Sequence, residues 1–312
     1  MNKIKKLMMF LFAMCMLLSA CGKSNTKTEK NDKAVTKSEK KIIYTTFFPV
    51  TELTKRIVGD KFEIKQIIEN NDEPHSFELK TNDMRKLTYA DLVIYNGANM
   101  EGFIPDLKNA LGEEKFLDLS QGLTLLETKS DLETKNHDAV NPHTWLSIKN
   151  AIEQLDTIYK KISSIDPENK DFYKKNFEDN KVAFEEMDKK FKESIAKINK
   201  KDKYFVVSHA AFNYLADDYG LKQVAVTGIS PEEEPTAKQL KDIADFVKKN
   251  DINTIFFEGK ATPKVAETLA KNTNTKTGTM YTMENLSEEE KNLGYLDLMQ
   301  KNLDALMESF ND

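Results

Sequence analysis

Short apolar runs alternate with amphipathic stretches along the first half of the chain beyond residue 40. Runs rich in β-branched and aromatic residues predict strands. These runs occupy residues 42–47, 62–68, 92–95 and 116–119. Helical spacing of apolar residues predicts helices at 53–58, closing at Gly59, and at 84–90. Strands separated by helices are typical of βαβ units, so this half is predicted to form a mainly parallel sheet.

The middle of the chain has a different period. Four apolar side chains recur every seven residues: Phe177, Phe184, Phe191 and Ile198. Such spacing predicts an apolar stripe on a helix, and the fixed φ of Pro167 suits a first helical turn. We therefore predict one helix over residues 166–200. At 1.5 Å per residue it would be roughly 50 Å long, enough for a rigid spine that joins two domains.

The second half repeats the alternation of strands and helices. Predicted strands occupy residues 205–207, 223–226 and 254–257, and predicted helices occupy residues 210–219, 236–249 and 263–270. A final helix is predicted from the capping box formed by Ser287 and Glu290 to about residue 310. The sequence therefore predicts an α/β fold of two lobes and one long helix. The limits that we assign to these three parts are residues 41–165, 166–200 and 201–312.

The first twenty residues have the composition of an export signal. Lys3, Lys5 and Lys6 precede an apolar stretch at residues 7–18, which is short for a permanent membrane-spanning helix. Small residues before Cys21 resemble the bacterial lipobox, in which the cysteine thiol is acylated. We therefore predict a signal at 1–20, a lipidated Cys21 and a flexible polar tether over residues 21–40. An ordinary signal peptide with an incidental cysteine is the alternative.

These terminal segments change how the cysteines and the charges are interpreted. Cys15 lies within the predicted signal, so the exported chain would have no free thiol and no disulfide. The signal and the tether each carry +3 and the whole chain carries −5, which leaves −11 on residues 41–312. An acidic body argues against nucleic acid as a partner. It is compatible with the attraction of a cation.

Three of the four histidines lie in turn-like segments near the ends of predicted strands. His75 and His143 each follow a proline, and His209 closely follows the strand at 205–207. Ligands of open α/β sheets bind at the carboxyl ends of strands, and neutral imidazole is a usual zinc ligand. A single histidine at a strand end is more often a hydrogen-bonded structural residue. The residues alone therefore indicate a candidate metal site between two lobes, without deciding its ligands.

Five stretches of the chain closely resemble the metal-binding lipoproteins of bacterial ABC importers. They are EPHSFEL at 73–79, YADLVIYNGANME at 89–101, NPHTWL at 141–146, VSHAAFNYLADDYGL at 207–221 and GISPEEEPTAKQL at 228–240. These importer proteins are the cluster A-I solute-binding proteins, and the match is to their zinc-type, ZnuA-like branch over about residues 41–310. The resemblance implies two (β/α)4-type lobes joined by a long rigid helix. It also implies a metal ion in the interlobe cleft.

The resemblance further implies the ligands and the role of the protein. The three histidine positions of the family fall on His75, His143 and His209, and the fourth position falls on Glu284, which some relatives are thought to leave to water. Manganese-type relatives carry Glu in place of the third histidine, and three nitrogens with one oxygen suit Zn²⁺. The implied protein is a monomer, lipid-anchored on the extracytoplasmic face of the cell membrane. It would capture Zn²⁺ and deliver it to the membrane subunits of an ABC permease.

Other functions are compatible with parts of this pattern. A manganese or iron importer would use the same fold, and a surface adhesin could hold an incidental ion. A zinc-dependent hydrolase would need an open coordination position and a general base. Glu284 would close the coordination sphere, and we find no second acid positioned as a base, so we expect no enzyme.

Two features depart from the pattern of the zinc-type family. Many relatives have a long loop rich in His and Asp before the second ligand, whereas residues 127–140 here contain a single histidine, His137, beside Asp138. We predict that His137 is solvated and is not a ligand. The family usually has Asp before the Pro-His pair, where this chain has Asn141. A carboxylate that could orient or charge-balance the site is absent there, which would alter the affinity and not the number of ligands.

Overall fold

The computed structural model describes residues 40–69, 72–127, 140–258 and 263–311. All of these residues belong to one compact unit. The signal, the tether, the lipidation of Cys21 and the solvation of His137 concern residues outside the described ranges and stay predictions. No helix within these ranges is both long enough and apolar enough to cross a membrane.

The first lobe is built on a parallel sheet. Its strands are β1 (Ile42–Thr45), β2 (Glu63–Gln66), β3 (Leu92–Tyr95) and β4 (Phe116–Asp118), in the spatial order β2-β1-β3-β4. Its helices are α2 (Phe48–Val58), α3 (Thr81–Leu87) and α4 (Ile104–Leu111), followed by a 3₁₀ turn, η1 (Glu113–Lys115). All neighbouring strands are parallel. Their carboxyl ends therefore lie along the same edge of the sheet, where ligands of such sheets bind.

The second lobe repeats this topology. Its strands are β5 (Tyr204–Val207), β6 (Lys222–Ala225), β7 (Thr254–Phe257) and β8 (Lys276–Thr279), in the order β6-β5-β7-β8. Its helices are α7 (Asn213–Tyr219), α8 (Ala237–Lys249), α9 (Pro263–Thr273), α10 (Glu288–Lys291) and α11 (Gly294–Asn311). All neighbouring pairs are again parallel. The same order of strands therefore recurs in two lobes in which we detect no sequence repeat.

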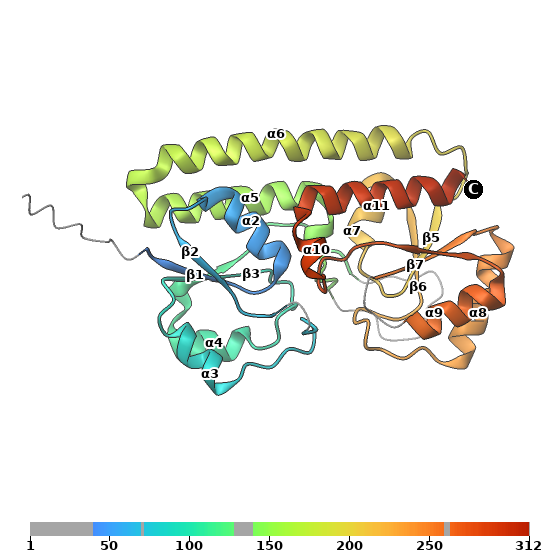
Figure 1. The fold of residues 1–312 in the computed structure, drawn as a ribbon, viewed down its shortest axis with the longest axis horizontal. Helices are drawn as coiled ribbons and strands as arrows, with labels where there is room; N and C mark the ends of the chain where they lie inside the picture. The colour runs from blue at the N-terminus through green and yellow to red at the C-terminus, as the bar shows by residue number, and fades with distance from the viewer. Residues whose placement is uncertain (1–39, 70–71, 128–139, 259–262, 312) are drawn as a thin grey trace, which may run out of the picture. The chain divides into compact units, whose positions relative to one another are not determined.

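Two long helices connect the sheets along the sequence. They are α5 (Ile148–Ile165) and α6 (Lys170–Ile195), separated by the 3₁₀ turn η3 (Pro167–Asn169). Helix α6 packs against α2 and α5 and also against α11, as Figure 1 shows. Phe177 of α6 stacks on Tyr159 with ring centroids 5.3 Å apart, and Phe184 stacks on Tyr295 at 5.1 Å. The predicted α/β fold, with two parallel-sheet lobes and a long helix, is confirmed.

One large apolar core includes residues of both lobes. It contains Ile43 of β1, Phe184 and Phe191 of α6, Phe205 of β5 and Leu298 of α11. A smaller cluster joins residues of the second sheet to α8 and α9. Protein interiors are close-packed and have low compressibility. A core that both lobes share with α6 therefore opposes a wide rotation of one lobe against the other.

The prediction of a single final helix is wrong. Ser287 caps a helix as predicted, because its side chain accepts a hydrogen bond from the backbone N–H of Glu290. That helix, α10, ends at Lys291, and α11 begins at Gly294. Gly294 has a φ of 76°, a left-handed conformation that interrupts a right-handed helix and that glycine adopts without a Cβ clash.

The long helix and the second sheet also differ from the prediction. The residues Pro167–Asn169 form a 3₁₀ turn, and α6 ends at Ile195, so the helix is shorter than residues 166–200. Strand β8, Lys-Thr-Gly-Thr, escapes sequence analysis because it lacks an apolar run. Helix α4 was likewise not predicted. The division of the chain into two lobes and a linking segment at residues 41–165, 166–200 and 201–312 stays a prediction.

Candidate metal centre

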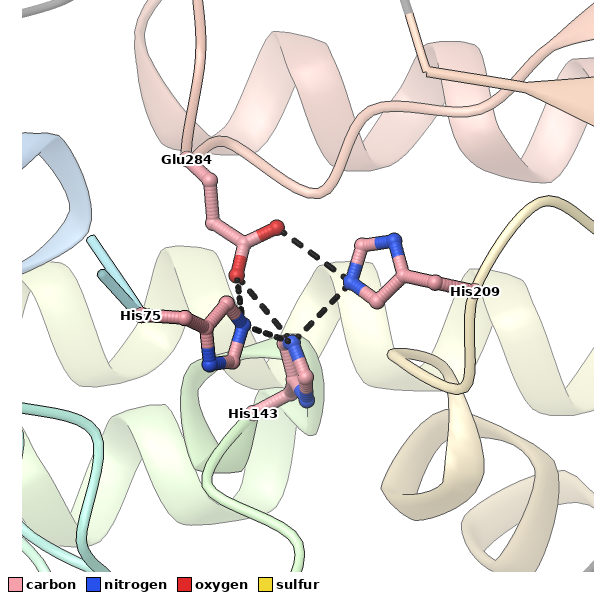
Figure 2. A group of neighbouring side chains, drawn as sticks. All are labelled: His75, His143, His209 and Glu284. Carbon is pink, nitrogen blue, oxygen red and sulfur yellow. Dashed lines mark hydrogen bonds and ion pairs between the residues drawn. The ribbon is translucent and has the colours of Figure 1, made fainter. Parts of the chain in front are cut away.

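The four predicted ligands come from four loops, each of which follows a strand. His75 lies between β2 and α3, and His143 lies after β4, immediately before the 3₁₀ turn η2 (Thr144–Leu146). His209 lies between β5 and α7, and Glu284 lies between β8 and α10. Figure 2 shows the four side chains pointing toward one another. Two loops from each lobe therefore supply the cluster, as expected for side chains at the carboxyl edges of parallel sheets.

The spacing of the donor atoms suits a tetrahedral ion. One donor atom from each of the four residues lies within 4.8 Å of all the others. His143 Nε2 lies 3.3 Å from His75 Nε2 and 3.1 Å from His209 Nε2. Glu284 Oε1 lies 3.0 Å from His75 Nε2 and 3.1 Å from His143 Nε2. Ligands bound to Zn²⁺ at about 2.0–2.1 Å in a tetrahedron would lie roughly 3.3 Å from one another.

The cluster is removed from solvent. His143 and His209 are fully buried, Glu284 is 4% exposed, and the side chain of His75 is 10% exposed. Glu284 Oε2 is buried and has no hydrogen-bond partner within the described ranges. It lies 3.4 Å from His209 Nε2. A buried carboxylate oxygen without a partner is costly, and a cation held among these donors would remove that cost.

Two of the imidazole rings are oriented by hydrogen bonds from their other nitrogen. His143 Nδ1 donates to Asn141 Oδ1 at 2.8 Å. His209 Nδ1 forms a short contact with Glu258 Oε1. A ring that carries its proton on Nδ1 presents the lone pair of Nε2, which is the atom that points into the cluster. Both rings are therefore arranged to bind a cation through Nε2.

The buried charges act on the three ionisable groups in different directions. Burial lowers the pKa of His143 to about 4, although the charge of Glu284 acts the other way. Burial also opposes protonation of His209, but the carboxylates of Glu258 and Glu284 outweigh it and raise the His209 pKa to about 9. Burial disfavours ionised Glu284, but His143 and His209 hold its pKa well below the ordinary range. Without a cation, His209 therefore carries a positive charge beside the carboxylates of Glu258 and Glu284.

The sequence analysis missed two carboxylates at this centre. Glu258 is buried, contacts His209, and accepts a hydrogen bond of 2.5 Å from Ser208 Oγ. Glu73 accepts a hydrogen bond of 3.2 Å from the backbone N–H of His75. Burial and the nearby charge of Glu284 raise the Glu73 pKa to about 7. Glu258 directly follows β7, so its position at the carboxyl end of a strand was the signal that could have found it.

The loop that carries Glu284 is tied to the loop that carries His143. Trp145 Nε1 donates to the carbonyl oxygen of Thr282 at 2.7 Å, and Tyr295 Oη donates to the carbonyl oxygen of Trp145 at 2.5 Å. Met283 adopts a φ of 67°, which is uncommon for a residue with a Cβ. These bonds hold a ligand loop of the second lobe against a ligand loop of the first.

The fold and the cluster define a two-lobed protein with a buried candidate cation site, and comparison with known proteins places it in a family. Residues 43–309 match the family of the periplasmic zinc-uptake complex component A, ZnuA. The chain belongs to this family, as the resemblance implied. Its relatives are uptake and zinc-binding proteins rather than enzymes. They confirm the expectation that this chain is not an enzyme.

Three similar proteins illustrate the relationship. The high-affinity zinc uptake system protein ZnuA of Bacillus subtilis is 38% identical over 96% of each chain. The zinc-binding lipoprotein AdcA of Streptococcus pneumoniae is 36% identical over 98% of this chain, which spans 61% of that protein. The crystal structure of the Zn(II)-bound ZnuA-like domain of AdcA has a TM-score of 0.75 and 36% identity, with coverage of 88% of this chain and 100% of that one.

Proposed function

We propose that this protein binds one Zn²⁺ outside the cytoplasm and delivers it to an ABC permease for uptake. The observation that carries the proposal is the buried group of three imidazole nitrogens and one carboxylate, whose donor atoms lie within 4.8 Å of one another. The family of the chain and the Zn(II)-bound AdcA domain support zinc as the cargo. The zinc ligands in this proposal are His75, His143, His209 and Glu284.

The donor set favours zinc over the harder metals. Mn²⁺ prefers oxygen donors, whereas imidazole suits Zn²⁺, so His209 disfavours the manganese alternative. Cu²⁺ and Ni²⁺ bind nitrogen donors as strongly or more strongly. Geometry and supply therefore decide which ion the site holds in the cell. With Glu284 bound, the four-coordinate shell is closed, which suits transport better than hydrolysis.

Capture and release would depend on loops rather than on a wide hinge. The apolar core common to both lobes and α6 opposes large closure. Zinc would therefore order the loops that carry His209 and Glu284 with small displacement of the lobes. Docking on the permease would favour release by moving those loops apart.

Zinc titration tests the proposal directly. We expect one Zn²⁺ per chain, and at free zinc of 1,000 times Kd the ion adds about 4 kcal/mol to the free energy of unfolding. For a domain of this size the midpoint of thermal unfolding should rise by roughly 8–16 °C. Native mass spectrometry gives the stoichiometry, and calorimetry gives the midpoint. A chain that binds no zinc, or that binds Mn²⁺ in preference, would refute the proposal.

We propose further that the chain is a monomer anchored to the membrane through a lipid on Cys21. The named lipoprotein among its relatives supports this assignment. The Cys21→Ser variant is expected to move from the membrane fraction to the soluble extracytoplasmic fraction, because the acylated thiol is lost. Cys15→Ser is the matched control, since Cys15 lies in the predicted signal and should leave the distribution unchanged. Detergent phase partitioning measures both, and membrane retention of Cys21→Ser would exclude the lipid anchor.

A further inference from the structure

Asn141 makes hydrogen bonds toward two ligand loops at once. Its Oδ1 accepts from the backbone N–H of His143 at 3.0 Å and from His143 Nδ1 at 2.8 Å. Its Nδ2 donates to the carbonyl oxygen of Ala210 at 2.7 Å and to Asn213 Oδ1 at 3.0 Å. Asn141 is fully buried. The side chain therefore links the ring of His143 to the residue that follows His209.

Backbone groups determine which way the Asn141 amide points. The N–H of His143 can only donate and the carbonyl of Ala210 can only accept, so Oδ1 must face His143 and Nδ2 must face Ala210. The reverse orientation would place donor against donor and acceptor against acceptor in a buried site. Such unsatisfied pairs cost about 1–3 kcal/mol each. The amide is thereby held in one orientation.

A series of hydrogen bonds between side-chain amides extends from Asn141 into the second lobe and fixes how each amide points. Asn213 Oδ1, which accepts from Asn141, also accepts from Gln223 Nε2 at 2.7 Å. Gln223 Oε1 accepts from the backbone N–H of Phe212 at 2.6 Å. The Phe212 N–H can only donate, so it orients Gln223, which in turn orients Asn213 and then Asn141. Both ends of this series of hydrogen bonds are therefore fixed by backbone groups, each of which can only donate or only accept.

We infer that Asn141 is a positioning residue that keeps the Nδ1–H tautomer of His143 and couples that ring to the loop of His209. A neutral imidazole carries one proton, and an acceptor fixed at Nδ1 keeps the proton there. The lone pair of Nε2 then faces the cluster. The inference rests on the proposed function, because it assigns His143 Nε2 to zinc.

Aspartate at this position would keep only half of these bonds. A carboxylate accepts from His143 as well as the amide does, but it has no donor for Ala210 or Asn213. Its second oxygen would face two acceptors at the distances that Nδ2 now occupies. In this chain the carbonyl oxygen of Ala210 and Asn213 Oδ1 therefore fit asparagine and oppose aspartate.

The tautomer of His143 is the readout that tests the inference. Two-bond ¹H–¹⁵N spectra of the metal-free chain labelled at its four histidines distinguish Nδ1–H from Nε2–H, and zinc affinity is measured by competition with a chelator. Asn141→Ala should lose the Nδ1–H signature of His143 and weaken zinc binding by roughly 10–100-fold, the usual loss when a partner of a ligand is removed. Asn141→Asp should keep the signature, because it keeps the acceptor.

Gln223→Glu tests the chain of amides away from His143. It replaces the donor to Asn213 by an acceptor of similar size and should weaken zinc binding by roughly tenfold, the lower end of that range. Gln121→Glu makes the same change at an exposed position and should have no effect. If wild type binds zinc and Asn141→Ala changes neither the tautomer nor the affinity, the inference is wrong and the proposed function stands. If wild type binds no zinc, the proposed function itself fails.

Discussion

The His209→Ala variant is expected to bind zinc roughly 100–1,000-fold more weakly than wild type. The apparent free energy of zinc binding at four-ligand sites is about 10–16 kcal/mol, or about 2.5–4 kcal/mol per ligand. The loss of one ligand therefore weakens binding by roughly 100–1,000-fold. The loss has a second cause at this site. Glu258 and Glu284 would stay buried after losing the imidazole that lies between them.

Two measurements check this expectation. Competition with a chelator of known affinity gives Kd for the purified variant, and circular dichroism shows whether it is folded. In a strain without the chromosomal gene, the variant should not restore growth in zinc-depleted medium, whereas added zinc should. An adhesin with an incidental ion would show no such requirement for zinc.

His137→Ala is the matched control for His209→Ala. It makes the same substitution at the one histidine that is predicted to be solvated and not to bind zinc. Its affinity should equal that of wild type within about twofold, since changes at positions without a specific role are usually within about 0.5 kcal/mol. Equal losses in the two variants would contradict the ligand assignment.

The apolar strands of the fold could be predicted from sequence, and the polar strand β8 could not. β3 and β7 occupy the predicted residues 92–95 and 254–257, because four consecutive apolar or β-branched residues leave little alternative to a buried strand. β8 is polar and largely exposed, so only its pairing with β7 identifies it as a strand. Gly294 shows the same limit for helices, since its break depends on a backbone conformation and not on a change in periodicity.

The histidines of the site could be found because they are rare. The chain has four histidines but 51 acidic residues, so a carboxylate at a strand end, such as Glu258, attracts no notice among so many. The order of hydrogen bonds is likewise invisible in sequence. Set beside the family pattern, Asn141 predicts the loss of an orienting carboxylate. The geometry shows instead an amide that orients His143 and also donates to the loop of His209.

The affinity for zinc is expected to fall at least tenfold for each unit of pH below about 9. The ordinary pKa of histidine, near 6.5, would by itself place the fall below about pH 6. In the structure the carboxylates of Glu258 and Glu284 raise the His209 pKa to about 9 against the effect of burial. The metal-free protein therefore holds a proton on His209 at neutral pH, and zinc must displace it. Between pH 7.5 and 5.5 the affinity should fall at least about 100-fold.

The shifted pKa values of His143 and Glu284 limit the pH range over which the zinc affinity changes. Burial lowers the pKa of His143 to about 4, so its proton competes with zinc only in more acidic solution. Glu284 stays ionised throughout, since the two imidazoles His143 and His209 hold its pKa well below the ordinary range despite burial. Above about pH 9 the proton has already left His209, and the dependence caused by this residue should disappear.

Calorimetry in two buffers of different ionisation enthalpy measures directly how many protons the protein releases when zinc binds. About one proton should leave His209 for each zinc bound at pH 7.5. Glu258→Gln keeps an oxygen acceptor for the His209 ring but removes the charge that raises the His209 pKa. This variant should therefore release fewer protons on zinc binding, and its zinc affinity should depend less on pH above 7. The raised pKa of His209 has no role in zinc binding if wild type releases no proton at pH 7.5 and holds the same affinity from pH 8.5 to 6.5. In that case zinc would bind the imidazoles without displacing a proton from His209.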